Sequence, residues 1–236
     1  MRKYKPLQRI FTAIPPRYDL INSIMTLGMD RGWRRGAIRE CLRSNPGKVL
    51  DLCCGTGDLL AGLVRRAGGD VEFVGIDYSP PMLEIASKKL APLAGAGKVS
   101  LVCGDAAAMP FPDGCFDCVG ISFAFRNLTY KNPMAQRHLA EVLRVLKDGG
   151  RFVIVETSQP KWKLIRKLNH LFLRWFAFRI GAWLSGDRDA YFYLTDSASR
   201  FYAPDEVRAL LLGAGFQAVT YRPLFFGAAG IYVAVK

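Results

Sequence analysis

Short apolar runs alternate along this chain with longer segments in which apolar residues recur at helical spacing. The runs predict strands near residues 48–53, 71–76, 99–104, 116–122 and 151–156. The segments between them predict helices near 58–67, 81–91 and 133–147, the last of which we expect to end at the glycines of 149–150. Such alternation is typical of a parallel sheet with right-handed crossovers and helices on both faces.

The end of the chain follows another pattern. A helix is predicted from Asp205 to Leu212, and two apolar runs near 217–222 and 229–235 follow it directly. Because no helical crossover fits between these runs, we expect them to pair as antiparallel strands. The whole pattern predicts one α/β domain over residues 1–236, with a seven-stranded, mostly parallel sheet whose last strand is antiparallel.

A glycine-rich turn ends the first predicted strand. Gly55 and Gly57 allow the backbone to approach a ligand where a side chain would collide. Asp58 then begins a helix, whose free N–H groups can receive an anionic group. The dinucleotide-binding fingerprint needs a third glycine where this chain has Leu60. A ligand with a ribose and a carboxylate but no phosphates therefore fits better.

Acidic residues stand where the next two predicted strands end. Asp77 closes the second run, and a carboxylate there can accept both hydroxyls of a ribose. Asp105 follows the third run, at the edge where open α/β sheets bind ligands. The set Asp51, Gly55, Gly57, Asp77 and Asp105 resembles the S-adenosylmethionine site of class I methyltransferases. A nicotinamide enzyme and an α/β domain without a ligand are the alternatives.

The composition suits a folded protein that meets a polyanion. Apolar residues make up 50% of the 236, which argues against extended disorder, and the net charge of +13 predicts attraction to nucleic acid or to an anionic lipid surface. Cys115 and Cys118 have CxxC spacing without a second such pair, so we expect the six cysteines to be reduced and to hold no metal. Residues 1–12 lack the apolar core of a signal peptide, which favours the cytoplasm.

Two segments lie outside the predicted sheet. Residues 1–45 are basic at their start and then helical, and they either fold over the open site as a lid or pack on the edge of the sheet. A basic, aromatic helical insertion covers about 161–200. Its stretch 161–184 interleaves cations with aromatic residues too often for a membrane span. It is either an interfacial helix or a core helix whose arginines reach out to water.

Several separate stretches carry a family resemblance. They are Arg-Tyr-Asp-Leu-Ile-Asn at 17–22, Gly-Met-Asp-Arg-Gly-Trp-Arg at 28–34, Leu-Asp-Leu-Cys-Cys-Gly-Thr-Gly-Asp at 50–58, Phe-Pro-Asp at 111–113 with Ile-Ser-Phe-Ala-Phe-Arg-Asn at 121–127, and Gly-Asp-Arg-Asp-Ala-Tyr-Phe-Tyr-Leu at 186–194. From about residue 10 to the C-terminus, the chain resembles the C-methyltransferases of ubiquinone and menaquinone biosynthesis. Generic methyltransferases share the 50–58 stretch but not the other stretches together.

The resemblance implies an S-adenosylmethionine site and a quinol site. It assigns cofactor contacts to Asp51, Gly55, Thr56, Gly57, Asp77, Tyr78, Asp105, Ala106 and Ser122. Arg126 and Asn127 match residues that face the quinol head, and Arg126 could stabilise a developing phenolate. Tyr18 and Asp19 are the first candidates for the proton acceptor. His138 is a weaker one, which we expect at the surface. The family often has Asn in place of Asp105.

The implied reaction is methylation of a ring carbon of a prenylated hydroquinone, either demethylmenaquinol or a ubiquinone precursor. The implied setting is a prokaryotic cytoplasm, on the inner face of the cell membrane, with anionic lipid and the quinol as partners and a homodimer as a possible assembly. A methyltransferase acting on RNA or on another small molecule is an alternative, although no nucleic-acid-binding motif appears. A non-catalytic scaffold is the other.

Overall fold

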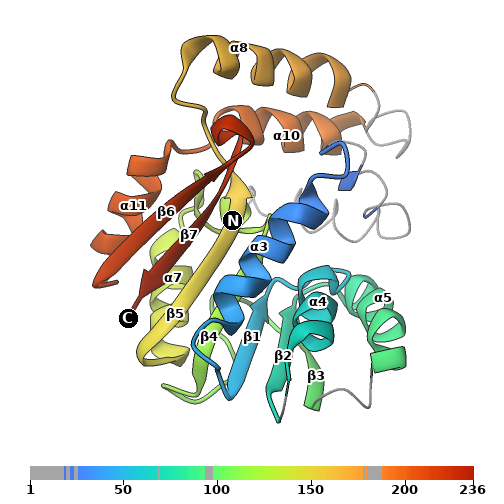
Figure 1. Cartoon of the computed structure of the whole chain (residues 1–236), viewed down its shortest axis with the longest axis vertical. Helices are drawn as coiled ribbons and strands as arrows, with labels where there is room; N and C mark the ends of the chain where they lie inside the picture. The colour runs from blue at the N-terminus through green and yellow to red at the C-terminus, as the bar shows by residue number, and fades with distance from the viewer. Residues whose placement is uncertain are drawn as a thin grey trace.

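The computed structural model describes Asp19 and residues 22–23, 26–68, 70–93, 98–177, 179 and 188–236. The centre is a seven-stranded sheet in the order β3-β2-β1-β4-β5-β7-β6 (Figure 1). Its strands are β1 (Lys48–Leu52), β2 (Glu72–Asp77), β3 (Lys98–Cys103), β4 (Phe116–Ser122), β5 (Leu146–Thr157), β6 (Ala218–Leu224) and β7 (Ala229–Val235). The first five pair in parallel, and β7 is antiparallel to both β5 and β6. The predicted sheet is therefore confirmed.

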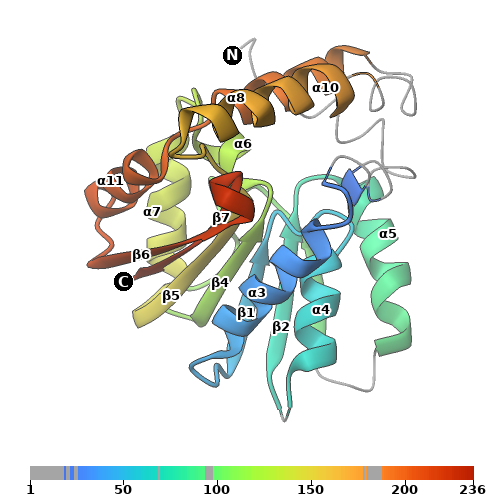
Figure 2. The ribbon, with the colours of Figure 1, turned by 45° about the horizontal axis from the view of Figure 1, so that its top comes forward.

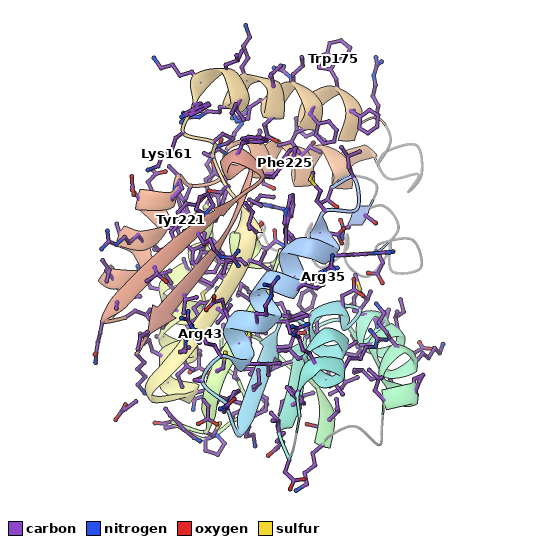
Figure 3. All side chains as sticks on the ribbon, in the orientation of Figure 1. Arg35, Arg43, Lys161, Trp175, Tyr221 and Phe225 are labelled. Atoms are coloured by element: carbon purple, nitrogen blue, oxygen red, sulfur yellow. The ribbon has the colours of Figure 1, made fainter. Side chains whose placement is uncertain are left out.

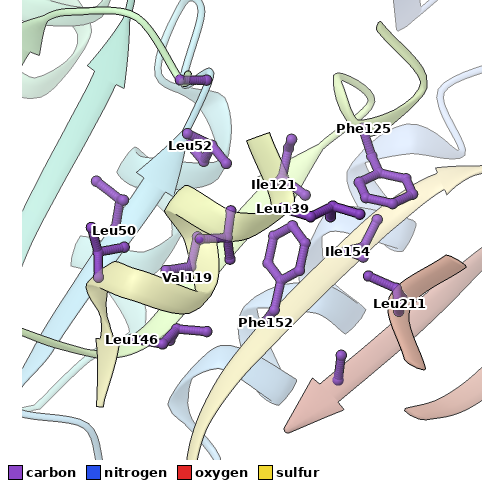
Figure 4. Close-up of a cluster of buried hydrophobic side chains, with 14 of the residues drawn as sticks. Leu50, Leu52, Val119, Ile121, Phe125, Leu139, Leu146, Phe152, Ile154 and Leu211 are labelled. Atoms are coloured by element: carbon purple, nitrogen blue, oxygen red, sulfur yellow. The ribbon is translucent and has the colours of Figure 1, made fainter. Parts of the chain in front are cut away.

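Helices cover both faces of this sheet. One face carries α3 (Asp30–Leu42), α4 (Asp58–Arg66) and α5 (Pro80–Leu90), followed by a short 3-10 turn, η2 (Ala91–Leu93). The other carries α7 (Ala135–Val145) and α11 (Pro204–Gly213), whose residues Leu139 and Leu211 pack around Phe152 of β5 (Figure 4). Strand residues alternate between the two clusters, since Cys118 faces one and Val119 the other. Burial on both faces explains the continuous apolar runs of the strands.

The boundary between α7 and β5 differs from our expectation. We placed the end of the helix at the glycines of 149–150, but α7 ends at Val145 and β5 begins at Leu146. Leu146 already pairs with Phe116 of β4, and the register shifts before Cys118 pairs with Arg151. Gly149 takes a φ of 75° inside this irregularity. The glycines thus bend a strand and do not cap a helix.

The described part of the N-terminal segment contacts both the sheet and the site, and a lid over the site stays a prediction. Helix α3 packs Ala37, Ile38 and Cys41 into the core of one sheet face, as a packing helix does. Asp19 and Asn22, which precede it, lie at the carboxyl edge of the sheet, where the site is found. Much of the apolar stretch between residues 20 and 25 lies outside the described residues.

The insertion forms α8 (Lys163–Leu171), a π-helical continuation η3 (Phe172–Ala177), and α10 (Arg188–Ser199). Figure 2 shows α8 lying along α10, above the carboxyl edge of the sheet. No residue of α8 is fully buried. Among the residues that the structure describes, no helix combines the length and apolar character needed to cross a bilayer.

Candidate functional site

A cavity of about 470 Å³ lies at the carboxyl edge of the sheet. The ends of β1, β2 and β4 and the loop after β3 line it, as expected for an open α/β sheet. It brings together most of the residues assigned to the cofactor, namely Asp51, Gly55, Thr56, Asp77, Tyr78, Asp105, Ala106 and Ser122. Asp19 and Asn127, from the expected catalytic group, line it too. Tyr18 lies outside the described residues.

The two glycines of the turn after β1, Gly55 and Gly57, have different surroundings. Gly55 has a φ of 53°, and a Cβ there would meet nothing within 4 Å, so the backbone stands open to the cavity. Gly57 has a φ of 79° and does not line the cavity; its Cβ would lie 3.0 Å from that of Ala86 on α5. Gly57 therefore lacks the open approach to the cavity that Gly55 has, and its expected contact with a ligand stays a prediction. Its small size instead lets α5 pack against the turn.

Asp77 fixes the turn from the neighbouring strand. Its Oδ2 accepts a 2.9 Å hydrogen bond from the Gly55 amide, and its Oδ1 accepts one of 2.9 Å from the Ser79 amide. Burial raises the pKa of this carboxyl, although the amides of Ser79 and Gly55 oppose that effect. Each oxygen keeps a lone pair for a further donor. Asp77 thus holds the turn and can still bind hydroxyl groups in the cavity.

Three buried side-chain oxygens in the cavity wall have no hydrogen-bond partner in the described structure: Asp51 Oδ2, Ser122 Oγ and Asn127 Oδ1. Buried polar atoms are seldom left without a hydrogen-bond partner. The cavity therefore suits a ligand that carries hydrogen-bond donors. Asp51 is only 1% exposed, and burial raises its pKa well above the ordinary value, while a hydrogen bond from the Leu60 amide partly offsets this. A cationic donor beside Asp51 would relieve the cost of its charge.

The loop after β3 supplies a small, apolar corner. Asp105 Oδ1 accepts a 2.8 Å hydrogen bond from the Ala107 amide, which shapes the turn. Ala106 and Ala107 are buried and have small side chains. Met82 of α5 and Leu128 also line the cavity. These neighbours offer apolar surface to a flat ring.

Arg126 was expected to face the substrate, but it does not line the cavity. It is 6% exposed, and its Nη1 lies 3.1 Å from Glu156 Oε1 and 2.8 Å from Thr157 Oγ1. Its Nε donates to Ser197 Oγ of α10 at 3.1 Å. Arg126 belongs to the short helix α6 (Phe125–Thr129), and the next residue, Asn127, does reach the cavity. Any role of Arg126 in catalysis therefore acts through its neighbours.

His138 was expected at the surface, and this expectation is wrong. His138 is 6% exposed and lines the cavity. Nδ1 lies 3.0 Å from the carbonyl oxygen of Leu128, which can only accept, so Nδ1 carries the proton. Burial lowers the pKa of the ring, opposed by the hydrogen bond to Leu128 and by the charge of Asp105. A neutral ring with this tautomer presents Nε2 as an acceptor.

A charged network joins the N-terminal segment to the glycine turn. Asp19 Oδ1 accepts a 2.6 Å hydrogen bond from Thr56 Oγ1, and Asp19 Oδ2 lies 2.8 Å from Lys89 Nζ. Lys89 also contacts Asp58, which pairs with Arg34 of α3 at 2.9 Å. This network holds Asp19 against the cavity.

Sequence reasoning missed several residues that line the cavity: Asn22, Arg34, Met82, Asn132 and Met134. Asn22 and Arg34 each stood within a stretch that carried the family resemblance, which was the one available signal. The other three, Met82, Asn132 and Met134, come from segments that reach the edge only through tertiary packing, so no local pattern marks them.

Comparisons with known proteins identify the family of this chain. The model of the ubiE/COQ5 methyltransferase family matches residues 1–236. The demethylmenaquinone methyltransferase of Deinococcus radiodurans is 41% identical over 236 residues, covering 99% of this chain and 94% of that protein. The protein of the same name from Thermus thermophilus is 41% identical over 224 residues, covering 95% and 98%. The ubiquinone/menaquinone biosynthesis C-methyltransferase UbiE of Geobacter sulfurreducens is 37% identical, covering 99% and 90%.

Solved structures share the fold at low identity. A methyltransferase of Thermotoga maritima, described as a possible histamine N-methyltransferase, superimposes with a TM-score of 0.65 at 17% identity, covering 98% of this chain and 99% of that one. A SAM-dependent methyltransferase of Aquifex aeolicus gives 0.57 at 19% identity, covering 80% and 81%. These likenesses show the fold alone, and they confirm the expected class I methyltransferase architecture. By its whole length, the chain belongs to the ubiE/COQ5 methyltransferase family and is an S-adenosylmethionine-dependent methyltransferase.

Proposed function

We propose that this enzyme methylates a ring carbon of a prenylated hydroquinone, with demethylmenaquinol as the first candidate and a ubiquinone precursor as the second. The names of its relatives, which match over nearly their full length, support this substrate class. The observation that carries the proposal is the cavity at the carboxyl edge of the sheet. In its wall, buried oxygens of Asp51, Ser122 and Asn127 have no hydrogen-bond partner in the described structure.

The acceptor groups of the cavity fit S-adenosylmethionine part by part. Asp77 would accept the ribose hydroxyls through its remaining lone pairs. The unpaired Oδ2 of Asp51 would receive the ammonium group of the methionine part, which neutralises a costly buried charge. The corner formed by Asp105, Ala106 and Met82 would hold the adenine. When bound there, the cofactor supplies a methyl group on a positively charged sulfur.

The remaining wall of the cavity would receive the quinol. Ser122 at the end of β4 and Asn127 of α6 present hydrogen-bonding groups to the cavity. The ring carbon becomes nucleophilic when a neighbouring hydroxyl loses its proton, so the protein must supply an acceptor and keep water out. Asp19 and His138 both line the cavity and can accept a proton. Alignment of carbon and methyl group supplies the rest of the rate enhancement.

Arg126 takes the role of a positioning residue in this proposal. Its contacts with Glu156, Thr157 and Ser197 connect the end of β5 and helix α10 to α6. Because Asn127 follows it directly, the network fixes the side chain that faces the quinol.

Peripheral membrane binding on the cytoplasmic face is part of the proposed function, since a prenylated substrate resides in a bilayer. Leu164, Leu168, Leu171 and Trp175 are spaced to form one exposed stripe along α8 and η3, and each is more than half exposed. Lys163, Lys167 and Arg174 flank this stripe and can bind anionic headgroups. The alternative of a core helix is less well supported, because no residue of α8 is fully buried.

Two experiments test the function. Calorimetric titration with S-adenosylmethionine separates an enzyme from a scaffold, since a scaffold needs no intact cofactor site. Turnover with radiolabelled cofactor then compares demethylmenaquinol, ubiquinone precursors and RNA. We expect label in a quinol product, and label in RNA alone would contradict the proposal.

A further inference from the structure

The tip between β6 and β7 has an unusual backbone. Phe225 and Phe226, in the 3-10 turn η4 (Phe225–Gly227), take φ values of 42° and 54°. Bulky residues rarely adopt this left-handed conformation, which glycine and asparagine tolerate. The two side chains are 51% and 73% exposed, so burial does not compensate the strain. Strain that packing leaves unexplained points to a function of the side chains themselves.

The topology places this tip at the same edge of the sheet as the cavity. β5 and β6 are both antiparallel to β7, so β6 runs parallel to β1–β5 and ends at the same edge of the sheet. A Cβ on Gly227 would lie 3.3 Å from Pro160, which shows that η4 contacts the segment leading from β5 to α8. Trp162, on that segment, is 73% exposed. Figure 3 shows Phe225 beneath α8, near Lys161.

The charge around the tip indicates which partner it binds. Residues 157–177 contain five Lys or Arg and no Asp or Glu. Exposed aromatic and apolar side chains among cations fit the headgroup and acyl boundary of an anionic bilayer. A second copy of this chain is a poor fit, because both copies would carry a net charge of +13.

We propose that Phe225 and Phe226 insert into an anionic bilayer as a second contact beside α8. Two separated contacts fix the orientation of a bound protein, so the carboxyl edge of the sheet faces the lipid. The cavity then opens where a prenyl tail emerges, which rests on the proposed function for the identity of the substrate. The strained backbone holds both rings outward at the tip.

The test uses the full chain with Phe225→Asn and Phe226→Gly together. Both replacements suit the left-handed backbone, so thermal unfolding should occur at the same or a higher temperature than in the wild type. The matched control is Leu212→Ser, an exposed apolar residue at the end of α11 and at the opposite edge of the sheet. Co-sedimentation with vesicles of phosphatidylglycerol and phosphatidylcholine is measured at low and high salt.

We expect the double variant to lose vesicle affinity by about tenfold or more, mainly in the salt-resistant part, because the two rings that insert into the bilayer are removed. Leu212→Ser should stay within about twofold. Equal binding of the double variant and the wild type would overturn the proposal. So would a change from dimer to monomer in light scattering without loss of vesicle binding, since the tip would then be a contact between copies.

A second readout separates this inference from the proposed function. The double variant should methylate a tail-less, water-soluble hydroquinone at the wild-type rate, but should lose turnover of prenylated substrate held in vesicles. If neither protein methylates any quinol, the proposed function fails, while the vesicle measurement still decides the role of the tip.

Discussion

The guanidinium of Arg126 and the carboxylate of Glu156 form a buried ion pair, with 3.1 Å between Nη1 and Oε1. Glu156 is fully buried, and its Oε2 also accepts a hydrogen bond from the Arg126 amide at 3.0 Å. The pair joins the exit of β4 to the end of β5, and Ser197 extends it to α10. The pair therefore supports α6, whose residue Asn127 lines the cavity.

Removing one member of this pair should destabilise the protein. Arg126→Ala leaves Glu156 buried without its partner, at a cost of about 3–5 kcal/mol in the free energy of unfolding. The double variant Arg126→Met, Glu156→Leu removes both charges and should recover most of that loss. We expect this double variant to bind the cofactor but to lose most of its kcat, because Asn127 is no longer held. Wild-type kcat in the double variant would leave the pair with a purely structural role.

Cofactor binding should depend on Asp77. Replacing Asp77 with Ala removes charge-assisted hydrogen bonds to the ribose and should weaken S-adenosylmethionine binding by roughly 1.5–3 kcal/mol, or about 10- to 150-fold. Asp70→Asn is the control, since Asp70 is exposed just before β2, at the opposite edge. Calorimetry gives both dissociation constants. Unchanged affinity in Asp77→Ala would remove Asp77 from the cofactor site.

Asp51 should oppose stability and support binding. Its folded-state pKa is raised by burial, so ionisation costs folding free energy at neutral pH, and the cost is relieved as pH falls through that pKa toward the unfolded value of about 3.9. Without cofactor at pH 8, Asp51→Asn should therefore unfold about 2–4 °C above the wild type, or about 1 kcal/mol. The difference in unfolding temperature between Asp51→Asn and the wild type should become smaller at lower pH. The variant should lose its affinity for the cofactor. A variant less stable than the wild type at pH 8 would contradict this reasoning.

Asp19 is a candidate proton acceptor and also part of the network around the turn. If it only holds the N-terminal segment through Thr56 and Lys89, Asp19→Asn should speed cofactor release a few-fold, since the ion pair is partly exposed. If it accepts the proton, kcat should fall by about 10²–10⁴. The proposed function favours the larger loss. Stopped-flow release and steady-state turnover, with His138→Gln alongside, assign the proton acceptor to one of the two.

Vesicle binding should also depend on α8 and η3. Replacing Trp175, Phe176 and Arg179 together by Ser removes exposed rings and a cation that lies 5.1 Å over the Trp175 ring. We expect loss of most binding to anionic vesicles at low salt. Arg65→Ser, on α4 at the other edge, controls for the change in charge. Wild-type protein that stays in the supernatant with anionic lipid would defeat the proposal of membrane contact.

The sheet and the convergence of acidic residues at its carboxyl edge could be predicted because both depend on local patterns. Apolar runs mark strands, and parallel strands bring their carboxyl ends to one edge, so Asp51, Asp77 and Asp105 had to converge. Glycine-rich turns carry the same local signal. Gly57 shows the limit of that signal, since a Cβ there would meet Ala86 of α5 and the residue does not line the cavity.

Side chains that depend on distant partners could not be placed from sequence. Arg126 precedes the cavity residue Asn127 in the sequence. Its side chain does not line the cavity because it forms an ion pair with Glu156 of β5. His138 lies beside the core residue Leu139 on α7, at the margin between buried and exposed positions, where helical spacing does not decide. The strain at Phe225 and Phe226 has no sequence signal, because phenylalanine is not typical of a left-handed turn.

The most direct test of the account is turnover of demethylmenaquinol with S-adenosylmethionine labelled in its methyl group. The account predicts that label enters the quinol ring with wild-type enzyme and that Asp77→Ala reduces the rate in proportion to its loss of cofactor affinity at limiting cofactor. Tight cofactor binding without transfer of label to demethylmenaquinol or to a ubiquinone precursor would contradict it.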